Sequence, residues 1–150
     1  MIGIPAVIKA IQKVVPNHAI IIDQCAEEGC RAVNPSFPHI IIKGESLAAT
    51  GEKAVDCVFF IDKERSLFIA LVELKRRSYH INDVCEKLAN SERHAKAIAG
   101  AAGIRKARIQ RAVFCTGGHP RVNTAEYVIL AKRTGAVLKR CGSAVDALIG

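Results

Sequence analysis

Tryptophan is absent from this 150-residue chain, which also has only two tyrosines and one methionine. So few aromatic side chains argue against a base-stacking platform of the kind that single-strand nucleic-acid binders use. Long hydrophobic runs are absent too: apolar runs such as Ala19 to Ile22 and Leu67 to Val72 fall far short of the roughly 20 residues that a membrane span requires. We therefore expect no transmembrane helix.

Proline is scarce, with five residues, while 50% of the chain is hydrophobic and 24% is charged. This composition excludes a disordered tail, and a chain of this length has room for one well-packed domain but not for two ordinary ones. The first residues lack the basic region, the apolar stretch and the small-residue cleavage site of a secretory signal, which predicts a cytoplasmic protein.

Six cysteines are spread through apolar segments of the chain. In a cytoplasmic protein a reduced cysteine behaves as a small hydrophobic residue, so we expect no disulfides. Cys25 and Cys30 form a C-x4-C pair, but no second pair of ligands follows at the spacing of a zinc finger. A structural zinc site is therefore not expected.

The net charge of +8 is distributed unevenly. Residues 1–75 carry eight Lys and Arg against nine Asp and Glu, whereas residues 76–150 carry fourteen against five. A basic second half indicates a polyanionic partner, and nucleic acid is the first candidate. The alternative is a basic surface that does no more than keep the protein in solution.

Hydrophobic periodicity and turn residues predict an order of helices and strands that is typical of an α/β protein. Helices are expected at residues 5–15, from 82 to 100 or 103, and at 124–134, with a last helical turn at 143–148. Strands are expected at 18–23, 38–43, 55–61, 67–75, 109–116 and 136–139, with a loop at 24–37 and either a helical turn or a loop at 44–54. The expected fold is a single-domain mixed β-sheet flanked by helices, with its core at about residues 38–139.

The strongest hairpin signal is the pair of apolar strands on either side of a short polar segment. If the turn is centred between Glu64 and Arg65, Asp56 lies directly opposite Glu73. Side chains alternate along a strand, so Lys75 projects from the same face as Glu73, one step further along. This register, which a different turn length would shift, brings three charged groups together at one end of the hairpin.

Residues 67–72 are apolar at every position, so this strand is expected to be covered on both faces. Two adjacent carboxylates at its end repel each other, and removing them from water costs several kcal/mol unless a cation compensates. Lys75 supplies one positive charge, and a divalent metal would supply the rest. Carboxylate oxygens favour Mg²⁺ or Mn²⁺ over softer ions.

Asp56, followed after sixteen residues by Glu73-Leu74-Lys75, resembles the active-site signature of the PD-(D/E)xK nuclease superfamily, which has the restriction-endonuclease-like fold. In that family a hairpin carries the Asp and the ExK, and a helix, a strand and a second helix follow; residues 55–134 can be laid out in this order. The resemblance implies that Asp56 and Glu73 bind the metal, together with the main-chain carbonyl of Leu74. Lys75 would orient the attacking water and stabilise charge on the phosphate.

The sequence departs from the family pattern in its third acid. Many members carry an acidic residue on the first core helix, but the helix expected at residues 5–15 contains no Asp or Glu. Glu45 and Glu52 are the nearest substitutes as a third metal ligand. Several members also have a Gln or Lys on the helix after the ExK strand, where Lys87 and Asn90 are the candidates.

Phosphate contacts are expected from basic residues that follow the ExK strand. Arg76, Arg77 and His80 come next in the chain, and such contacts position a nucleic acid without reading its sequence. On the next helix, Lys87 and Arg93 lie on the polar face. The alternative is a solvated turn and a solvated helix surface.

Together these features predict a metal-dependent (endo)nuclease that uses Mg²⁺ or Mn²⁺ to hydrolyse phosphodiester bonds, with DNA as the expected substrate. Two alternatives are left open: a non-catalytic nucleic-acid-binding or assembly module on the same fold, and an RNA-cleaving nuclease. A plain ion pair between Lys75 and either carboxylate would also account for the three charged residues. A chain of this length has little surface for recognising a long DNA sequence. We therefore expect structure-selective or weakly specific cleavage, or action as a homodimer, rather than restriction by a monomer.

Overall fold

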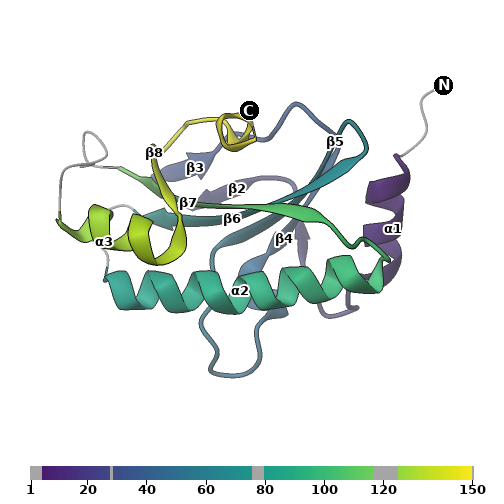
Figure 1. Cartoon of the computed structure of the whole chain (residues 1–150), viewed down its shortest axis with the longest axis horizontal. Helices are drawn as coiled ribbons and strands as arrows, with labels where there is room; N and C mark the ends of the chain where they lie inside the picture. Colours follow the sequence, from purple (N-terminus) through teal and green to yellow (C-terminus); the bar gives the residue numbers. More distant parts are fainter. Residues whose placement is uncertain (1–4, 28, 76–79, 117–124, 150) are drawn as a thin grey trace.

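The structure is a computed structural model that describes residues 5–27, 29–75, 80–116 and 125–149, arranged around one large sheet (Figure 1). In chain order the elements are α1 (Ala6–Val14), β1 (Ile21–Ile22), β2 (Cys25–Glu27), β3 (Cys30–Ala32), β4 (His39–Lys43), the 3₁₀ helix η1 (Gly44–Leu47), β5 (Cys57–Lys63), β6 (Ser66–Lys75), α2 (Ile81–Ala101), β7 (Ala107–Cys115), α3 (Ala125–Thr134), β8 (Val137–Arg140) and the 3₁₀ helix η2 (Val145–Leu148). Within these described residues, no helix is both long and apolar enough to cross a membrane.

The main sheet has six strands in the order β1-β4-β5-β6-β7-β8. Strands β1, β4, β5 and β6 pair antiparallel in succession, whereas β6, β7 and β8 run parallel. Parallel neighbours need a crossover connection, and α2 and α3 lie in the connections from β6 to β7 and from β7 to β8. The expected mixed α/β sheet is thus confirmed.

The β5–β6 hairpin has the register that the sequence predicted. Lys63 pairs with Ser66, which leaves Glu64 and Arg65 as the two turn residues. Both have positive φ values, 53° and 70°, as in the type I′ turn whose twist matches that of a hairpin. The Asp62 carboxylate accepts a hydrogen bond of 2.8 Å from the Arg65 amide. Strand β5 ends at Lys63 and β6 begins at Ser66, so both strands reach closer to the turn than the expected ends at residues 61 and 67, and the register is unchanged.

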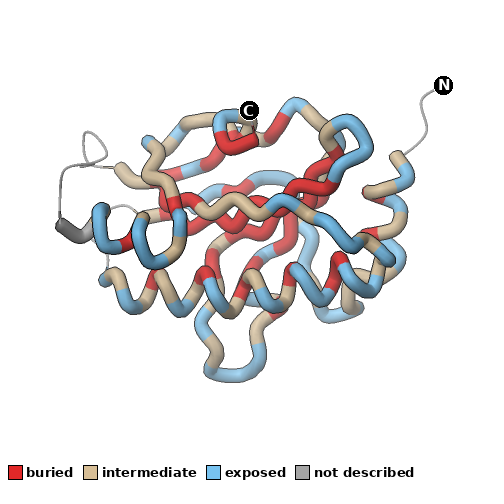
Figure 2. The backbone as a smooth tube through the Cα atoms, viewed as in Figure 1, coloured by how far each residue is buried: buried red, intermediate tan, exposed pale blue. Residues whose placement is uncertain are grey.

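The central strands are covered on both faces, and the buried residues concentrate there (Figure 2). On one face, α1, α2 and α3 pack against residues such as Val58 and Ile69. On the other face, the β2–β3 hairpin and η2 pack against residues such as Phe59 and Ala70. As the continuous apolar run predicted, residues 67–74 of β6 are all buried.

The other elements agree with the sequence prediction apart from their ends. The helices α1, α2 and α3 and the strands β4, β7 and β8 lie at the expected positions. Strand β1 has two residues instead of the six expected at 18–23, and the undecided segment 44–54 begins with the short helix η1. The sequence Gly117-Gly118-His119-Pro120 also predicts a turn after β7, but these residues lie outside the described part of the chain.

The structure differs from the prediction at residues 24–37, where β2 and β3 form a small antiparallel hairpin within the expected loop. Each strand has three residues, too few to show the alternation that identifies a strand from sequence. The hairpin is attached to the C-terminal segment, because the Val33 amide donates to the Ser143 carbonyl and the Val145 amide donates to the Val33 carbonyl. Contacts distant in sequence, and not local propensity, fix this hairpin.

Two disulfides also hold the β2–β3 hairpin, so the expectation of reduced cysteines is wrong for four of the six. Cys25 in β2 is bonded to Cys57 in β5, and their Cα atoms are 5.9 Å apart. Cys30 in β3 is bonded to Cys141 after β8, with Cα atoms 5.0 Å apart. These pairs are separated by 32 and 111 residues, and the pairing of distant cysteines cannot be deduced from sequence alone.

Alkylation of the denatured, unreduced protein should modify only the two free thiols, Cys85 and Cys115, whereas alkylation after reduction should modify all six cysteines. Denaturation is needed because burial raises the pKa of the Cys115 thiol to about 11 in the folded protein. Intact-mass measurement counts the added groups, and peptide mapping identifies the linked pairs. Six reactive thiols in protein purified without reductant would contradict both disulfides.

Candidate active site

Asp56 and Glu73 face each other where β5 begins and β6 ends, directly beyond the last pair of the hairpin ladder. The Asp56 amide donates a hydrogen bond of 3.2 Å to Glu73 Oε1. The Leu74 amide donates one of 2.7 Å to Asp56 Oδ2. Each carboxylate is therefore held by a main-chain amide of the opposite strand, as the predicted register requires.

Two lysines compensate the charge of Glu73, whose side chain is completely buried. Lys87 from α2 lies 2.6 Å from Glu73 Oε2, and Lys75 at the end of β6 lies 3.1 Å from the same oxygen. Without such partners, a buried carboxylate would cost several kcal/mol. The structure thus brings together the three residues that the sequence predicted, Asp56, Glu73 and Lys75, and adds Lys87.

Both carboxyl groups have raised pKa values. Burial raises the pKa of Glu73, and the charge of Asp56 raises it further, while Lys87 only partly opposes these effects. Burial is also the main reason why the pKa of Asp56 is raised, and the nearby carboxyl group of Glu27 adds to that shift. Burial alone would lower the pKa of Lys87, but its hydrogen bond to Glu73 and the charge of that residue leave it raised. Burial therefore outweighs the two lysines, and both carboxyl groups hold their protons more tightly than free side chains do.

Glu92, elsewhere on α2, shows by comparison how burial and the neighbouring Asp56 affect the pKa of Glu73. It is partly buried and has two cationic partners, Lys96 at 2.9 Å and Arg111. Burial acts to raise the pKa of Glu92, but the hydrogen bonds from Lys96 and Arg111 outweigh it, so the pKa is lowered. Glu73 also has two cationic partners, yet its pKa is raised because it is more deeply buried and adjoins Asp56. Perturbed pKa values of this kind cluster at functional sites.

The main chain around Asp56 is fixed by two hydrogen bonds. The Gly44 amide donates to the Asp56 carbonyl at 3.0 Å, and the Val55 amide donates to Ser91 Oγ on α2 at 2.9 Å. A Cβ atom at Gly44 would lie 1.8 Å from the Val55 carbonyl oxygen, so no side chain fits there. Gly44 and Ser91 thus determine where the segment before β5 places Asp56.

Asp56 lines a pocket of about 490 Å³. The other charged residues that line it are Glu27, Lys43, Glu45, Glu52 and Lys87. Asp56 and Lys87 belong both to the charged cluster and to the pocket wall. A ligand in this pocket would therefore contact Asp56 and Lys87, whereas Glu73 lies behind them and does not line the pocket.

The two acids expected as a third metal ligand, Glu45 and Glu52, line this pocket but have different partners. Glu52 lies 2.5 Å from His94 Nε2 and also pairs with Arg93. Glu45 has an 84% exposed side chain, and its nearest cation, Lys43, is 3.9 Å away. The cationic partners of Glu45 and Glu52 thus differ from the two lysines that pair with Glu73.

Glu27, for which the sequence predicted no role, lines the same pocket as Asp56, and its carboxyl group contributes to the raised pKa of Asp56. It ends β2, two residues after the cysteine that is bonded to Cys57. Because Cys57 directly follows Asp56, the disulfide brings the end of β2 to the site. Only the folded hairpin makes this approach, so the sequence carries no local signal for it.

Gly44 and Ser91 were also missed, and of the two Ser91 had a readable signal. Ser91 is 2% exposed and occupies a position in the apolar stripe of α2 that Val84, Leu88 and Ala95 continue. A serine in such a stripe indicates a buried hydrogen bond. Gly44 has no comparable signal, because only the folded protein places the Val55 carbonyl group where a side chain at position 44 would lie.

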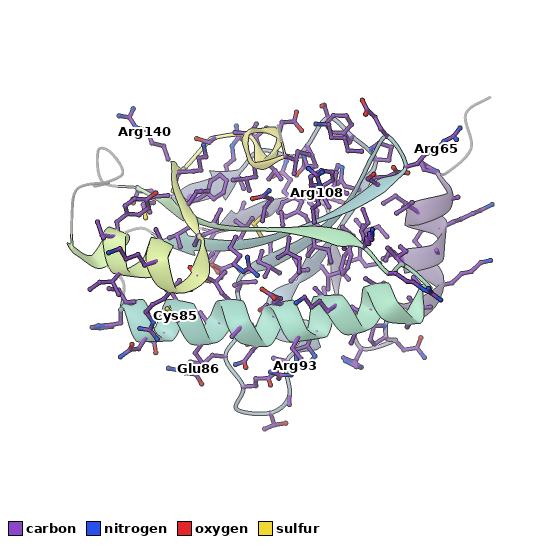
Figure 3. The ribbon with its side chains drawn as sticks, viewed as in Figure 1. Arg65, Cys85, Glu86, Arg93, Arg108 and Arg140 are labelled. Atoms are coloured by element: carbon purple, nitrogen blue, oxygen red, sulfur yellow. A yellow bond between two sulfur atoms is a disulfide. The ribbon has the colours of Figure 1, made fainter. Side chains whose placement is uncertain are left out.

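The residues predicted to contact phosphate are placed in part. Arg76 and Arg77 lie outside the described residues, and His80 is exposed just before α2. Arg93 projects from α2 toward the loop that precedes β5, where it is paired with Glu52 (Figure 3). Lys87 points into the carboxylate pair instead of solvent.

The carboxylate oxygens of the site are ligands of the kind that a hard divalent ion prefers. Within the described residues, however, no group of three or more His, Cys, Asp and Glu is arranged to hold a metal. Asp56 and Glu73 are in contact and present carboxylate oxygens, which Mg²⁺ and Mn²⁺ prefer. Lys87 supplies the positive charge at Glu73 Oε2. A metal shared by the two carboxylates would therefore compete with Lys87 for that oxygen.

Lys87→Met should lower the free energy of unfolding by roughly 2–4 kcal/mol at neutral pH, because it removes the closest cation from a buried carboxylate. The pKa of Glu73 is higher in the folded than in the unfolded protein, so stability falls as pH rises between these two pKa values. Loss of Lys87 raises the folded-state pKa of Glu73 further, because Lys87 lowers it in wild type. The destabilisation should therefore shrink as pH falls through the raised folded-state pKa of Glu73, because the lost lysine no longer matters once this carboxyl group is protonated in both proteins.

Urea unfolding of wild type and Lys87→Met at several pH values measures this difference. Lys96→Met on the same helix is the control, since Lys96 is 61% exposed and pairs with Glu92. Its effect should stay within about 0.5 kcal/mol. A pH-independent effect of Lys87→Met would contradict the assigned role of Glu73.

No family model matches the chain, and searches of curated proteins and of solved structures likewise find no match.

Proposed function

We propose that the chain is a metal-dependent nuclease of the PD-(D/E)xK type, with a restriction-endonuclease-like fold and DNA as its substrate. One observation carries the proposal: Asp56 and Glu73 meet across the hairpin, and Lys75 lies 3.1 Å from Glu73 on the same strand. The order of elements from β5 to α3 supports it, since a hairpin, a helix, a strand and a helix follow one another as in that family.

The chain's own residues suit phosphodiester hydrolysis. Asp56 and Glu73 would hold the metal, with the Leu74 carbonyl beside them, and a bound Mg²⁺ or Mn²⁺ would acidify a water and neutralise charge on the phosphate. Lys75 would orient the attacking water, and Lys87, once released from Glu73, would bind a phosphate oxygen as a point charge. The 490 Å³ pocket in front of Asp56 leaves space for the reacting group.

A second candidate, a non-catalytic nucleic-acid-binding module, is favoured by a different observation. Glu73 already has two lysine partners, so the charges of the site are largely satisfied by the protein itself. In that case the cluster would stabilise the end of β6, and the basic second half of the chain would bind phosphates. Metal-dependent cleavage separates the two candidates.

The test is cleavage of supercoiled plasmid, linear duplex, branched DNA and structured RNA, with Mg²⁺, with Mn²⁺ and with chelator. Lys75→Met should reduce cleavage about 10²-fold or more while binding persists. The control is Lys106→Met, an exposed lysine ahead of β7, which should cut like wild type. Salt-sensitive binding without cleavage of any substrate would favour the binding module, and cleavage confined to RNA would favour an RNA-cleaving nuclease.

A further inference from the structure

The loop at residues 48–56 joins η1 to β5, lies beside α2 and ends at Asp56 (Figure 1). Residues 52 and 54–56 of this loop line the 490 Å³ pocket. Its conformation therefore determines both the shape of the pocket wall and the position of the first carboxylate of the candidate active site. What holds the loop against α2 is thus part of what builds the site.

Two main-chain groups of the loop are bound by side chains of α2. Asn90 Nδ2 donates a hydrogen bond of 3.0 Å to the Lys53 carbonyl, and the Val55 amide donates one of 2.9 Å to Ser91 Oγ. These contacts hold the part of the loop that leads directly into Asp56. They leave the turn at residues 49–52, further back in the loop, to be fixed by other groups.

The Glu52 carboxylate fixes this turn. Its Oε1 accepts a hydrogen bond of 3.2 Å from the Ala49 amide, and the Glu52 amide donates one of 2.9 Å to the Ala49 carbonyl. The same Oε1 lies 2.5 Å from His94 Nε2, and Oε2 is paired with Arg93, both on α2. One carboxylate therefore closes the turn and binds it to the helix, and both of its oxygens have partners in the protein.

Glu52 is the stronger of the two charged side chains by which the loop reaches α2. Lys53 pairs with Asp83, but these side chains are 45% and 44% exposed, and an exposed ion pair contributes little to stability. The Glu52 side chain is 18% exposed and that of its partner His94 is 28% exposed, so their contact is better shielded from water. Figure 3 shows Arg93 projecting from α2 on the side of this loop.

We propose that Glu52 is a positioning residue of the candidate active site. Its carboxylate fixes the loop to α2 through His94 and Arg93, and the fixed loop places Asp56 opposite Glu73. The inference rests on the proposed nuclease function. It gives Glu52 a role other than that of a third metal ligand, because its oxygens are already used within the protein.

The experiment measures metal-dependent DNA cleavage and, in metal-free protein, hydrogen–deuterium exchange. At a temperature where the variant is folded, Glu52→Ala should lower kcat about tenfold or more and leave the KM for DNA unchanged, because a small displacement of Asp56 affects the reacting groups more than DNA binding. Exchange should rise in residues 49–56 and stay unchanged in residues 70–74. A raised KM with unchanged kcat would make Glu52 a DNA contact and overturn the proposal.

His94→Ala distinguishes a positioning residue from a metal ligand. If Glu52 bound the metal, removal of His94 would free its carboxylate and cleavage would not fall. If Glu52 positions the loop, cleavage should fall, and the effect of Glu52→Ala should be about threefold smaller in the His94→Ala background than in wild type. Wild-type cleavage by His94→Ala, or fully additive effects, would overturn the proposal.

Lys53→Ala is the matched control. It removes the neighbouring exposed ion pair with Asp83 and keeps the contact between the Lys53 carbonyl and Asn90. This variant should cleave DNA as wild type does. A loss equal to that of Glu52→Ala would overturn the particular role of Glu52.

Failure of the inference and failure of the proposed function give different results. Wild-type cleavage by folded Glu52→Ala would leave the nuclease intact and overturn the positioning role. Absence of cleavage by wild type would reject the nuclease, and exchange in the metal-free proteins would then decide by itself whether Glu52 fixes the loop. Unchanged exchange of residues 49–56 in Glu52→Ala would show that it does not.

Discussion

Glu73→Gln should reduce metal-dependent cleavage by about 10²- to 10³-fold. Glutamine keeps the size of the side chain and can still accept the hydrogen bond from the Asp56 amide, so the hairpin should retain its register. What it loses is the negative charge that pairs with two lysines at Oε2 and that a bound divalent ion would require. Steady-state cleavage of the preferred DNA substrate, with metal concentration varied, measures the loss.

Glu92→Gln is the matched control for this substitution. Glu92 also has two cationic partners and is partly buried, but it lies on α2 away from Asp56 and pairs with Lys96 and Arg111. Both variants leave two cations without a carboxylate, so their effects on urea unfolding are comparable in kind. Cleavage should be lost only in Glu73→Gln. Wild-type cleavage by Glu73→Gln would contradict the nuclease assignment, even if its stability were altered.

The Asp56–Glu73 pairing was predictable because it depends on local sequence. A two-residue turn at Glu64 and Arg65 sets the register, and a continuous apolar strand leaves few ways to slide it without exposing buried residues. The residues that close the hairpin therefore determine which side chains meet at its far end. The same reasoning gave the position of Lys75 on the face of Glu73.

The second partner of Glu73 was predictable only in part. The sequence placed Lys87 on the polar face of its helix and suggested a contact with phosphate. In the folded protein, α2 lies against β6, and Lys87 reaches the buried carboxylate instead. The helical pattern predicts on which face of the helix Lys87 lies, but the carboxylate that Lys87 contacts belongs to another element, β6.

The β2–β3 side of the site was not predictable from local patterns. Its strands are short, its attachment uses residues near the C-terminus, and its two disulfides span 32 and 111 residues. Each of these features exists only after the sheet has formed. The assumption of a reducing compartment concealed them further, since it treated every cysteine as a small apolar residue.

Gly44→Ala should destabilise the protein by about 3 kcal/mol or more and weaken cleavage as well. The new methyl group would lie 1.8 Å from the Val55 carbonyl oxygen, a main-chain atom that cannot turn aside as a flexible side chain can. The clash can be relieved only if the segment of Val55 and Asp56 shifts. Hydrogen bonds hold this segment, from the Val55 amide to Ser91 and from the Gly44 amide to the Asp56 carbonyl. Such a shift moves Asp56 relative to Glu73.

Gly100→Ala is the matched control, because a Cβ atom at Gly100, inside α2, would have no neighbour within 4 Å. Alanine at an open helical position should stabilise the protein by up to about 1 kcal/mol. Urea unfolding and cleavage at a temperature where both variants are folded separate lost stability from a displaced Asp56. If folded Gly44→Ala cleaved DNA as wild type does, the placement of Asp56 by Gly44 would be wrong, and the hairpin alone would be sufficient to position the carboxylates.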